Sequence, residues 1–269
     1  MMTKINFSYL KKLFHDQKYI LIFLFGFVFL FELSWVWILF KSDLSSFINN
    51  YANMLPQSIT NMIGFQAGSG MLSTQMMSFG YAHPLILISM CFLPVSLPAR
   101  YISGEIENRT FDIVLTKPVS RWVIPVQLYL FLLICLALLC TGLYFGTWLG
   151  TIIFNIQLHM FTYLKISVTG YLFFLSLAAI SMSVSSFNQE KGKAQARMIA
   201  IVVVLYFFDV IIRAIPDLDY LTAYSYFQLY QPTQLTLGNA GFLSSSIISL
   251  CIAVTFFIIA LIKFNRRDL

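Results

Sequence analysis

Three charged side chains, Glu32, Asp209 and Arg213, interrupt long apolar stretches of this sequence. Asp209 and Arg213 are four residues apart, a spacing that puts them on one face of a helix and allows an ion pair. Glu32 lies 13 residues beyond Tyr19 and Asp209 lies 11 beyond Met198, so the two carboxyls fall at similar depths in their apolar segments. An isolated charge inside a bilayer is unfavourable. We therefore expect one intramembrane polar cluster, which either joins two spans structurally or lines a substrate path.

Other chemistries find less support in the sequence. An intramembrane enzyme could use Glu32, Asp209 and His83, but no helical spacing assembles an acid, a base and a nucleophile. The motifs GxxxxGK[ST], HExxH, GxSxG and paired CxxC do not occur. The cysteines lie in apolar runs without metal-ligand spacing, at Cys91, Cys135, Cys140 and Cys251. We expect no catalytic residues, no metal and no cofactor bound by this chain.

The composition is that of a polytopic membrane protein: 59% of the residues are hydrophobic and only 10% are charged. Six apolar segments are expected to be spanning helices, at residues 19–40, 84–98, 123–146, 163–184, 198–215 and 243–264. The first has 22 residues and no cleavage site, so we expect a permanent helix. The second is short, which allows a start before Pro84, and Pro94 and Pro98 predict a kink or an early end.

The basic residues predict the orientation of this all-α fold. Fourteen Lys and Arg residues fall in the segments on the side of the two termini, and three fall on the opposite side. Both termini are therefore expected in the cytoplasm. Residues 1–18 predict an interfacial helix ahead of a six-span domain over residues 19–269, and the aromatic composition of residues 216–242 predicts a re-entrant segment on the outer side.

A polar, charge-dense island lies between the second and third spans, with the sequence RYISGEIENRTFDIVLTKPVSRW from Arg100 to Trp122. Ile106, Thr110 and Ile113 recur at helical spacing on one face, and Pro118 stops the helix. The pattern predicts a short amphipathic helix at the membrane surface.

The island resembles the signature of the ATP-binding-cassette type 2 permeases, the membrane subunits of bacterial exporters. Their pattern is approximately Gly-Glu-x-Glu-x-Gly-Thr-Leu-Glu-x-Leu-Leu-x-x-Pro-Val-Ser-Arg. Arg109 and Phe111 depart from it, whereas Asp112 and Val114 match in kind. The identical positions are Gly104, Glu105, Glu107, Thr110, Leu115, Pro118, Val119, Ser120 and Arg121. Residues 79–85 and 185–197 also resemble that family.

The resemblance implies a role for the island and a set of partners. Residues 104–117 would be a coupling helix seated in a cleft of a separate ABC ATPase, with Gly104, Glu105, Ile106, Glu107, Thr110, Asp112, Ile113, Pro118 and Arg121 as the coupling residues. It further implies a homodimer with two ATPase copies that carry ATP and Mg²⁺, a location in the bacterial plasma (inner) membrane among its lipids, and export of drugs, peptides, lipids, saccharides or ions. No nucleic-acid partner is expected.

Two alternatives remain beside the intramembrane enzyme. A secondary transporter would show inverted repeats, and no convincing repeat is found. A subunit that transmits force without its own substrate would dock an outer partner, for which only residues 41–83 are long enough.

Overall fold

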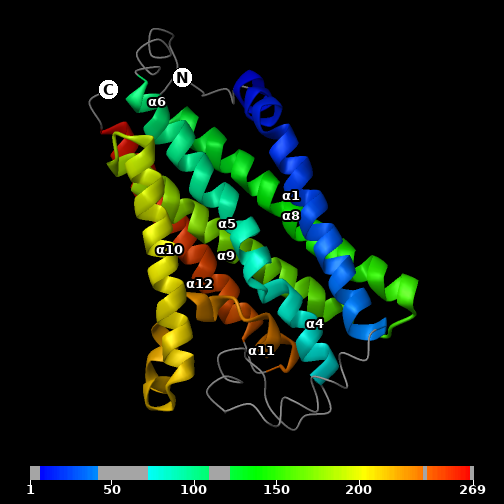
Figure 1. The fold of residues 1–269 in the computed structure, drawn as a ribbon. Coiled ribbons are helices and arrows are strands. Elements are labelled where there is room, and N and C mark those ends of the chain that lie inside the picture. The colour runs from blue at the N-terminus through cyan, green and yellow to red at the C-terminus, as the bar shows by residue number, and fades with distance from the viewer. Residues whose placement is uncertain (1–6, 42–71, 109–121, 239–240, 267–269) are drawn as a thin grey trace.

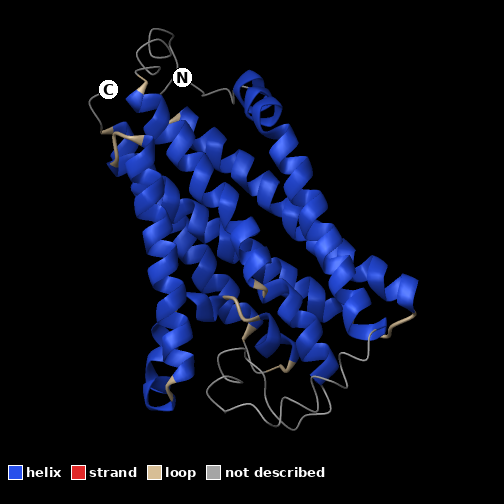
Figure 2. Ribbon diagram, in the orientation of Figure 1, coloured by secondary structure: helices blue, strands red, loops and turns tan. Residues whose placement is uncertain are grey.

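Helices account for nearly all of the described chain, and its described residues contain no strand (Figures 1 and 2). The structure, a computed structural model, describes residues 7–41, 72–108, 122–238 and 241–266. Its elements are α1 (Phe7–Lys41), α4 (Leu72–Ala82), α5 (Pro84–Pro98), the π-helix η1 (Ala99–Ser103), α6 (Gly104–Glu107), α8 (Val123–Phe154), α9 (Met160–Phe187), α10 (Lys191–Ala214), the 3₁₀ helices η2 (Pro216–Tyr224) and η3 (Tyr226–Leu229), α11 (Pro232–Thr236) and α12 (Phe242–Asn265).

Six stretches are long and apolar enough to cross a membrane, which confirms the predicted all-α, six-span fold. They are Tyr9–Leu39, Met76–Glu107, Val123–Phe154, Met160–Phe187, Lys191–Ala214 and Phe242–Asn265. The second stretch begins before Pro84, as its short apolar run allowed. The start of α1, α6 and the end of α12 lie at the same end of the bundle (Figure 1).

Helix α9 forms the centre of the bundle, where it packs against α12, α8 and α5, and α1 lies along α8. Most of α9 is buried, including a run of small and apolar residues from Phe173 to Ser183. By contrast, α10 buries only Ala194, Met198, Asp209 and Ile212 among its 24 residues. It is therefore less tightly held by its own chain than the central helices.

Close contact between α1 and α8 depends on glycines at four-residue intervals on α8: Gly142, Gly146 and Gly150. A Cβ atom on Gly146 would lie 2.7 Å from the carbonyl oxygen of Phe29, and one on Gly150 would lie 2.8 Å from Cγ1 of Val36. Small residues at this spacing let helix backbones approach one another in membranes. The third span thus provides a smooth face on which the first span packs.

The second span changes geometry twice along its length. His83 separates α4 from α5, and its Nδ1 accepts a hydrogen bond from the backbone N–H of Leu85 at 3.3 Å while Pro84 starts the new helix. After Pro98 the helix widens into η1, whose closing bond runs from the N–H of Gly104 to the carbonyl of Ala99. A π-helical turn of this kind accommodates an irregularity without ending the helix, and the chain passes directly into α6.

Helices extend into two of the connections between the expected spans: the one between the fourth and fifth spans and the one between the third and fourth. The spans expected at residues 163–184 and 198–215 leave residues 185–197 as the connection between them, but α9 extends to Phe187 and α10 starts at Lys191, so only residues 188–190 lie outside the helices. The charged residues of that segment have good helix propensity and continue α10 beyond its apolar part. At the other end α8 extends to Phe154, and Asn155 ends it in the left-handed conformation at φ 52°. From Phe7 onward, the segment expected to be an interfacial helix (residues 1–18) continues into the first span as one unbroken helix, α1.

Residues 216–238 fold back onto the bundle as η2, η3 and α11, which contact α10, α4 and α9. Phe227 and Tyr230 are buried, whereas Tyr220 and Tyr224 are exposed. The hydroxyl of Tyr230 donates to the carbonyl of Tyr81 at 3.3 Å and so ties this segment to α4. The depth of the segment in a membrane stays a prediction.

Candidate functional site

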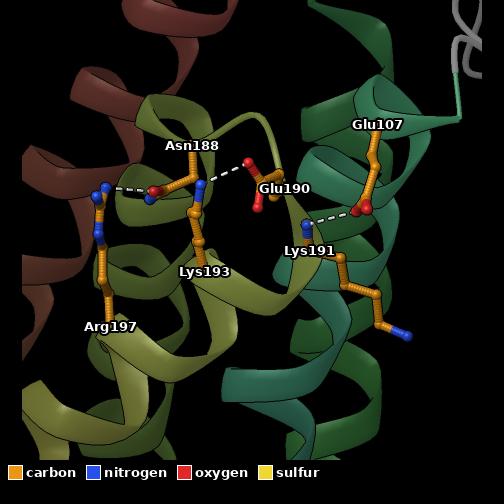
Figure 3. Close-up of polar contacts among 6 residues, drawn as sticks. All are labelled: Glu107, Asn188, Glu190, Lys191, Lys193 and Arg197. Atoms are coloured by element: carbon orange, nitrogen blue, oxygen red, sulfur yellow. Dashed lines mark hydrogen bonds and ion pairs between the residues drawn. The ribbon is translucent and has the colours of Figure 1, made fainter.

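The first residues of the polar island contact the connection between α9 and α10 (Figure 3). Oε2 of Glu107 accepts a hydrogen bond from the backbone N–H of Lys191 at 2.8 Å. One turn earlier, the hydroxyl of Ser103 donates to the carbonyl of Ser185 at 2.9 Å. These two bonds join connections that are more than 80 residues apart in sequence, and they lie at the end of the bundle where α1 begins and α12 ends.

The contact has a clear electrostatic cause. The first N–H groups of a helix have no acceptor within the helix and carry a partial positive charge. Helix α10 begins at Lys191, and the side chain of its N-cap residue, Glu190, accepts no capping hydrogen bond from a backbone N–H of the helix. Glu107 supplies a carboxylate at that position from a different element. The island therefore caps α10.

Gly104 is buried beside this contact, next to the side chain of Lys191. A Cβ atom at position 104 would lie 3.5 Å from the carbonyl of Ala99 and 3.6 Å from Cβ of Lys191, which is ordinary van der Waals contact. The backbone at Gly104 is right-handed helical, with φ of −69°. Neither spacing nor backbone conformation requires a glycine here.

Polar bonds also hold the α9–α10 connection itself (Figure 3). The side-chain amide of Asn188 donates to the carbonyl of Val184 at 2.6 Å, and its oxygen accepts from the guanidinium of Arg197. Lys193 pairs with Glu190 at 2.6 Å on the surface. An exposed pair of this kind contributes little to stability, so the Asn188 bonds are the main polar link between the end of α9 and the first turns of α10.

The structure describes only the start of the coupling helix predicted for residues 104–117. Glu105 is half-buried and Glu107 is exposed, while Ile106 is half-buried and packs against the core of this chain. The other predicted coupling residues lie outside the described residues: Thr110, Asp112, Ile113, Pro118 and Arg121. The coupling role of the whole set stays a prediction.

Glu32 is completely buried where α1 meets α4 and α8. Its Oε1 accepts from the hydroxyl of Thr147 at 3.2 Å, and Thr147 is 2.7 Å from the hydroxyl of Tyr81. Two glycines make room for the carboxyl, because a Cβ on Gly80 would lie 2.8 Å from Oε2 and one on Gly146 would lie 3.0 Å from Cβ of Glu32. Oε2 has no hydrogen-bond partner among the described residues.

Asp209 forms a second polar site on α10. One carboxylate oxygen pairs with the guanidinium of Arg213, and the other accepts from the hydroxyl of Ser225 at 2.5 Å. The side chain of Asp209 is buried, whereas that of Arg213 is 24% exposed. The ion pair expected from the i, i+4 spacing is present, and it also fixes the connection between η2 and η3 to α10.

These two sites do not form the single cluster expected from the sequence. Among the described residues, no hydrogen bond or ion pair connects Glu32 with Asp209 or Arg213. The reason is helix adjacency: α1 packs on α8 and α4, while α10 packs on η1, η2, η3 and α9. Similar depth in two spans does not imply that the spans are neighbours.

Comparison with protein families decides the family of this chain. The model of the ABC-2 family transporter proteins matches residues 10–269. The chain belongs to this family. A search of the curated proteins found no match. Family membership makes the chain the permease component of an ABC transporter, a multi-pass membrane protein that associates with an ABC ATPase.

Several residues of this ABC-2 transporter protein that matter to its polar sites were missed from the sequence. Lys191 falls in the connection between the expected fourth and fifth spans, although the residues KGKAQAR have the composition of a charged helix start. Thr147 directly follows Gly146 near the end of an apolar run, and nothing else in the sequence indicates that it is the partner of Glu32. Ser225 lies between two tyrosines in the irregular segment, and only the fold brings it to Asp209.

Proposed function

We propose that this ABC-2 transporter protein is the permease of an exporter in the bacterial plasma membrane, with two copies of the chain working with two copies of a separate ATPase. The ATPase binds ATP and Mg²⁺, and residues 104–121 couple its closure to the membrane helices. The end of the bundle with α6 faces the cytoplasm, in agreement with the distribution of basic residues.

The bond between Glu107 and Lys191 carries this proposal. A force applied to the island reaches α10 directly, since the carboxylate is bonded to the first residue of that helix. The bond from Ser103 to Ser185 transmits the same displacement to the end of α9. Because α9 is buried and α10 is largely exposed, α10 is the helix that moves with the smaller loss of packing.

A cross-linking experiment tests the contact with the ATPase. A photoreactive amino acid replaces Asn108, an exposed residue of the island, in the complex of the full chain with its partner ABC ATPase. We expect an ATPase adduct, and a two-to-two mass for the intact complex. The control position is Asn155, which is exposed at the opposite end and should give no adduct. Adducts from Asn155 but not from Asn108 would reverse the orientation and remove the coupling role of the island.

Transport itself is measured with the complex reconstituted in vesicles. ATP-dependent movement of a substrate from the side of the ATPase to the other side supports export. Movement of a substrate in the opposite direction would favour an importer. ATP hydrolysis without movement of any tested substrate would favour a subunit that transmits force.

A further inference from the structure

Glu32 is a buried carboxyl that the proposed coupling route does not use. It lies where α1 contacts α4 and α8, and the residue is 0% exposed. Both of its carboxyl oxygens face the backbone of Gly80, where an added Cβ atom would lie 2.8 Å from Oε2 and 3.1 Å from Oε1. On this side the space beside the carboxyl is too small for a methyl group. A proton fits there, whereas a larger ligand does not.

No ion pair balances the charge of Glu32 within the described part of the chain. Its Oε1 contacts the hydroxyl of Thr147, and its Oε2 has no partner among the described residues. Asp209 is also buried, but the guanidinium of Arg213 balances its charge and Ser225 donates to it. An unbalanced carboxylate inside a membrane is unfavourable, and such a group is neutralised by binding a proton. The two buried acids therefore differ in what neutralises them.

The other ionisable side chains near Glu32 supply no positive charge either. The ring of His83 lies 5.6 Å from that of Trp35 on α1, but its Nδ1 accepts a hydrogen bond from the N–H of Leu85 and is therefore unprotonated. Three tyrosines also interact electrostatically with the carboxyl, namely Tyr81, Tyr163 and Tyr230. A tyrosine is neutral or negative and never a cation. Only a proton is left to neutralise Glu32.

The contacts around Thr147 require one more hydrogen than its neighbours provide. Its hydroxyl oxygen lies 3.2 Å from Oε1 of Glu32, 2.7 Å from the hydroxyl of Tyr81 and 3.3 Å from the carbonyl of Leu143. Thr147 and Tyr81 supply one hydrogen each. If the carboxyl is ionised, Thr147 donates to Oε1 and its contact with Leu143 contains no hydrogen. If Oε1 carries a proton, Glu32 and Tyr81 both donate to Thr147, which donates to Leu143, so that each contact is a hydrogen bond.

We propose that Glu32 is a proton-binding site: it holds one proton at neutral pH, as a carboxylic acid that donates from Oε1 to Thr147, and releases it only when α1 separates from α8. Release breaks the O–H bond of the acid. The proton passes to a water molecule, and the bonding electrons stay on the carboxylate. Each opening of the contact between α1 and α8 is then linked to one proton. The site goes beyond the proposed export function and does not depend on an ATPase.

Infrared spectroscopy of the full chain tests this site, because a protonated carboxyl and a carboxylate have separate C=O bands. The protein is purified in a detergent without ester groups, with a heavy carbon isotope only in the side-chain carboxyl of glutamate. The chain has four glutamates, of which Glu105 is half-buried and Glu107 and Glu190 are exposed. We expect one band of a protonated acid that moves with the isotope at neutral pH. It should shift only slowly in heavy water, since Glu32 is the fully buried one of the four.

Substitutions assign the band to one residue. Glu32→Gln should remove it. Glu107→Gln and Asp209→Asn are the matched controls, one at an exposed glutamate and one at the other buried acid, and both should keep it. The isotope shift and the slow exchange are measured on the wild type, so the assignment to a buried glutamate does not depend on the folding of any variant.

A second set of variants tests the link to helix packing. An added Cβ on Gly146 would lie 3.0 Å from Cβ of Glu32, so Gly146→Ala pushes α1 away from α8 at this level. It should speed the exchange of the acid proton in heavy water about tenfold, the effect of lowering the free energy of opening by 1.4 kcal/mol. Gly150→Ala, one turn further along α8, is the second variant if the first does not fold. Gly104→Ala is the control and should leave the exchange rate unchanged.

Three results would overturn the proposal. Absence of a protonated glutamate band in the wild type would show that Glu32 is ionised. A band that appears only after sodium and potassium are removed would show that a metal cation occupies the site. Equal exchange rates in the wild type and in a folded Gly146→Ala or Gly150→Ala variant would separate the proton from the packing of α1 on α8. The spectra are recorded without the ATPase, so their outcome is separate from that of the export assay.

Discussion

The carboxylate of Glu107 lies 2.8 Å from the backbone nitrogen of Lys191 and caps a helix to which it does not belong. Its side chain comes from the end of the second span, and the helix that it caps is the fifth span. Loss of a cap that comes from the same helix weakens only that helix, whereas loss of the Glu107 cap also removes a bond between two spans at the end of the bundle that carries α6. Stability and coupling should therefore respond differently to changes at position 107.

Glu107→Ala should lower the free energy of unfolding by about 0.5–2 kcal/mol, the usual effect of losing a helix cap. Glu107→Gln retains an acceptor and loses the charge, so its effect should be smaller. We expect both variants to hydrolyse ATP with their ATPase and to transport less substrate per ATP, with alanine the more severe. Thermal unfolding in detergent and the transport-to-hydrolysis ratio in vesicles measure the two effects.

Glu190→Gln is the matched control for these variants. Glu190 is close to the same helix start, but among the described residues its side chain makes only the exposed pair with Lys193. This change should alter stability by less than about 1 kcal/mol and leave the transport ratio intact. Equal loss of coupling in Glu190→Gln and Glu107→Gln would mean that the negative charge near the start of α10 matters, and not the hydrogen bond from Lys191 to Glu107.

Substitution by alanine should affect stability differently at Gly104, in the predicted coupling helix, and at Gly146, on the face of α8 that packs against α1. Gly104→Ala should be nearly neutral, since a Cβ there meets atoms at 3.5 Å or more. Gly146→Ala should destabilise the protein by about 1–3 kcal/mol, the range for overpacked sites, because its Cβ would lie 2.7 Å from a backbone oxygen of α1. Unfolding temperatures of the two variants in one detergent compare them directly. A larger loss for Gly104→Ala would contradict the described packing of both residues.

Sequence and structure agree where local patterns determine the outcome. Long apolar runs predict the six spans, and the i, i+4 spacing predicts the pair of Asp209 with Arg213. They differ where the outcome depends on which helices are neighbours. Glu32 bonds to Thr147 on α8, because the glycines of α8 bring it close to α1, and nothing in the sequence of α1 alone indicates that partner.

The environment of Glu32 predicts distinct effects for three substitutions. Glu32→Gln keeps the oxygen that accepts from Thr147, so the variant should assemble normally. Thr147→Val removes the donor to Glu32 and the hydroxyl beside Tyr81, which should cost about 1–3 kcal/mol because buried polar atoms lose their partners. Glu32→Leu leaves Thr147 without that acceptor and should be at least as harmful as Thr147→Val.

Size-exclusion profiles and thermal unfolding rank these three variants, and substrate-stimulated ATP hydrolysis separates a structural role from a transport role. Normal assembly of Glu32→Gln with lost stimulation would place the carboxyl on the substrate path. Failure of Glu32→Gln to assemble would show that the acid itself, and not the shape of its side chain, holds α1 against α8.

The pair of Asp209 and Arg213 should be asymmetric, since the acid is buried and the base is partly exposed. Arg213→Gln leaves a buried carboxylate with Ser225 as its remaining described partner, and should lower the free energy of unfolding by about 3 kcal/mol, the lower end for a broken buried pair. Asp209→Asn leaves a guanidinium that can reach water, so its effect should be clearly smaller. The double variant carries no unpaired charge and should be more stable than Arg213→Gln alone. Unfolding of the three variants and the wild type at one pH forms a double-mutant cycle, whose coupling energy isolates the pair. A coupling energy near zero would show that Asp209 is held mainly by Ser225 and that its pair with Arg213 contributes little to stability.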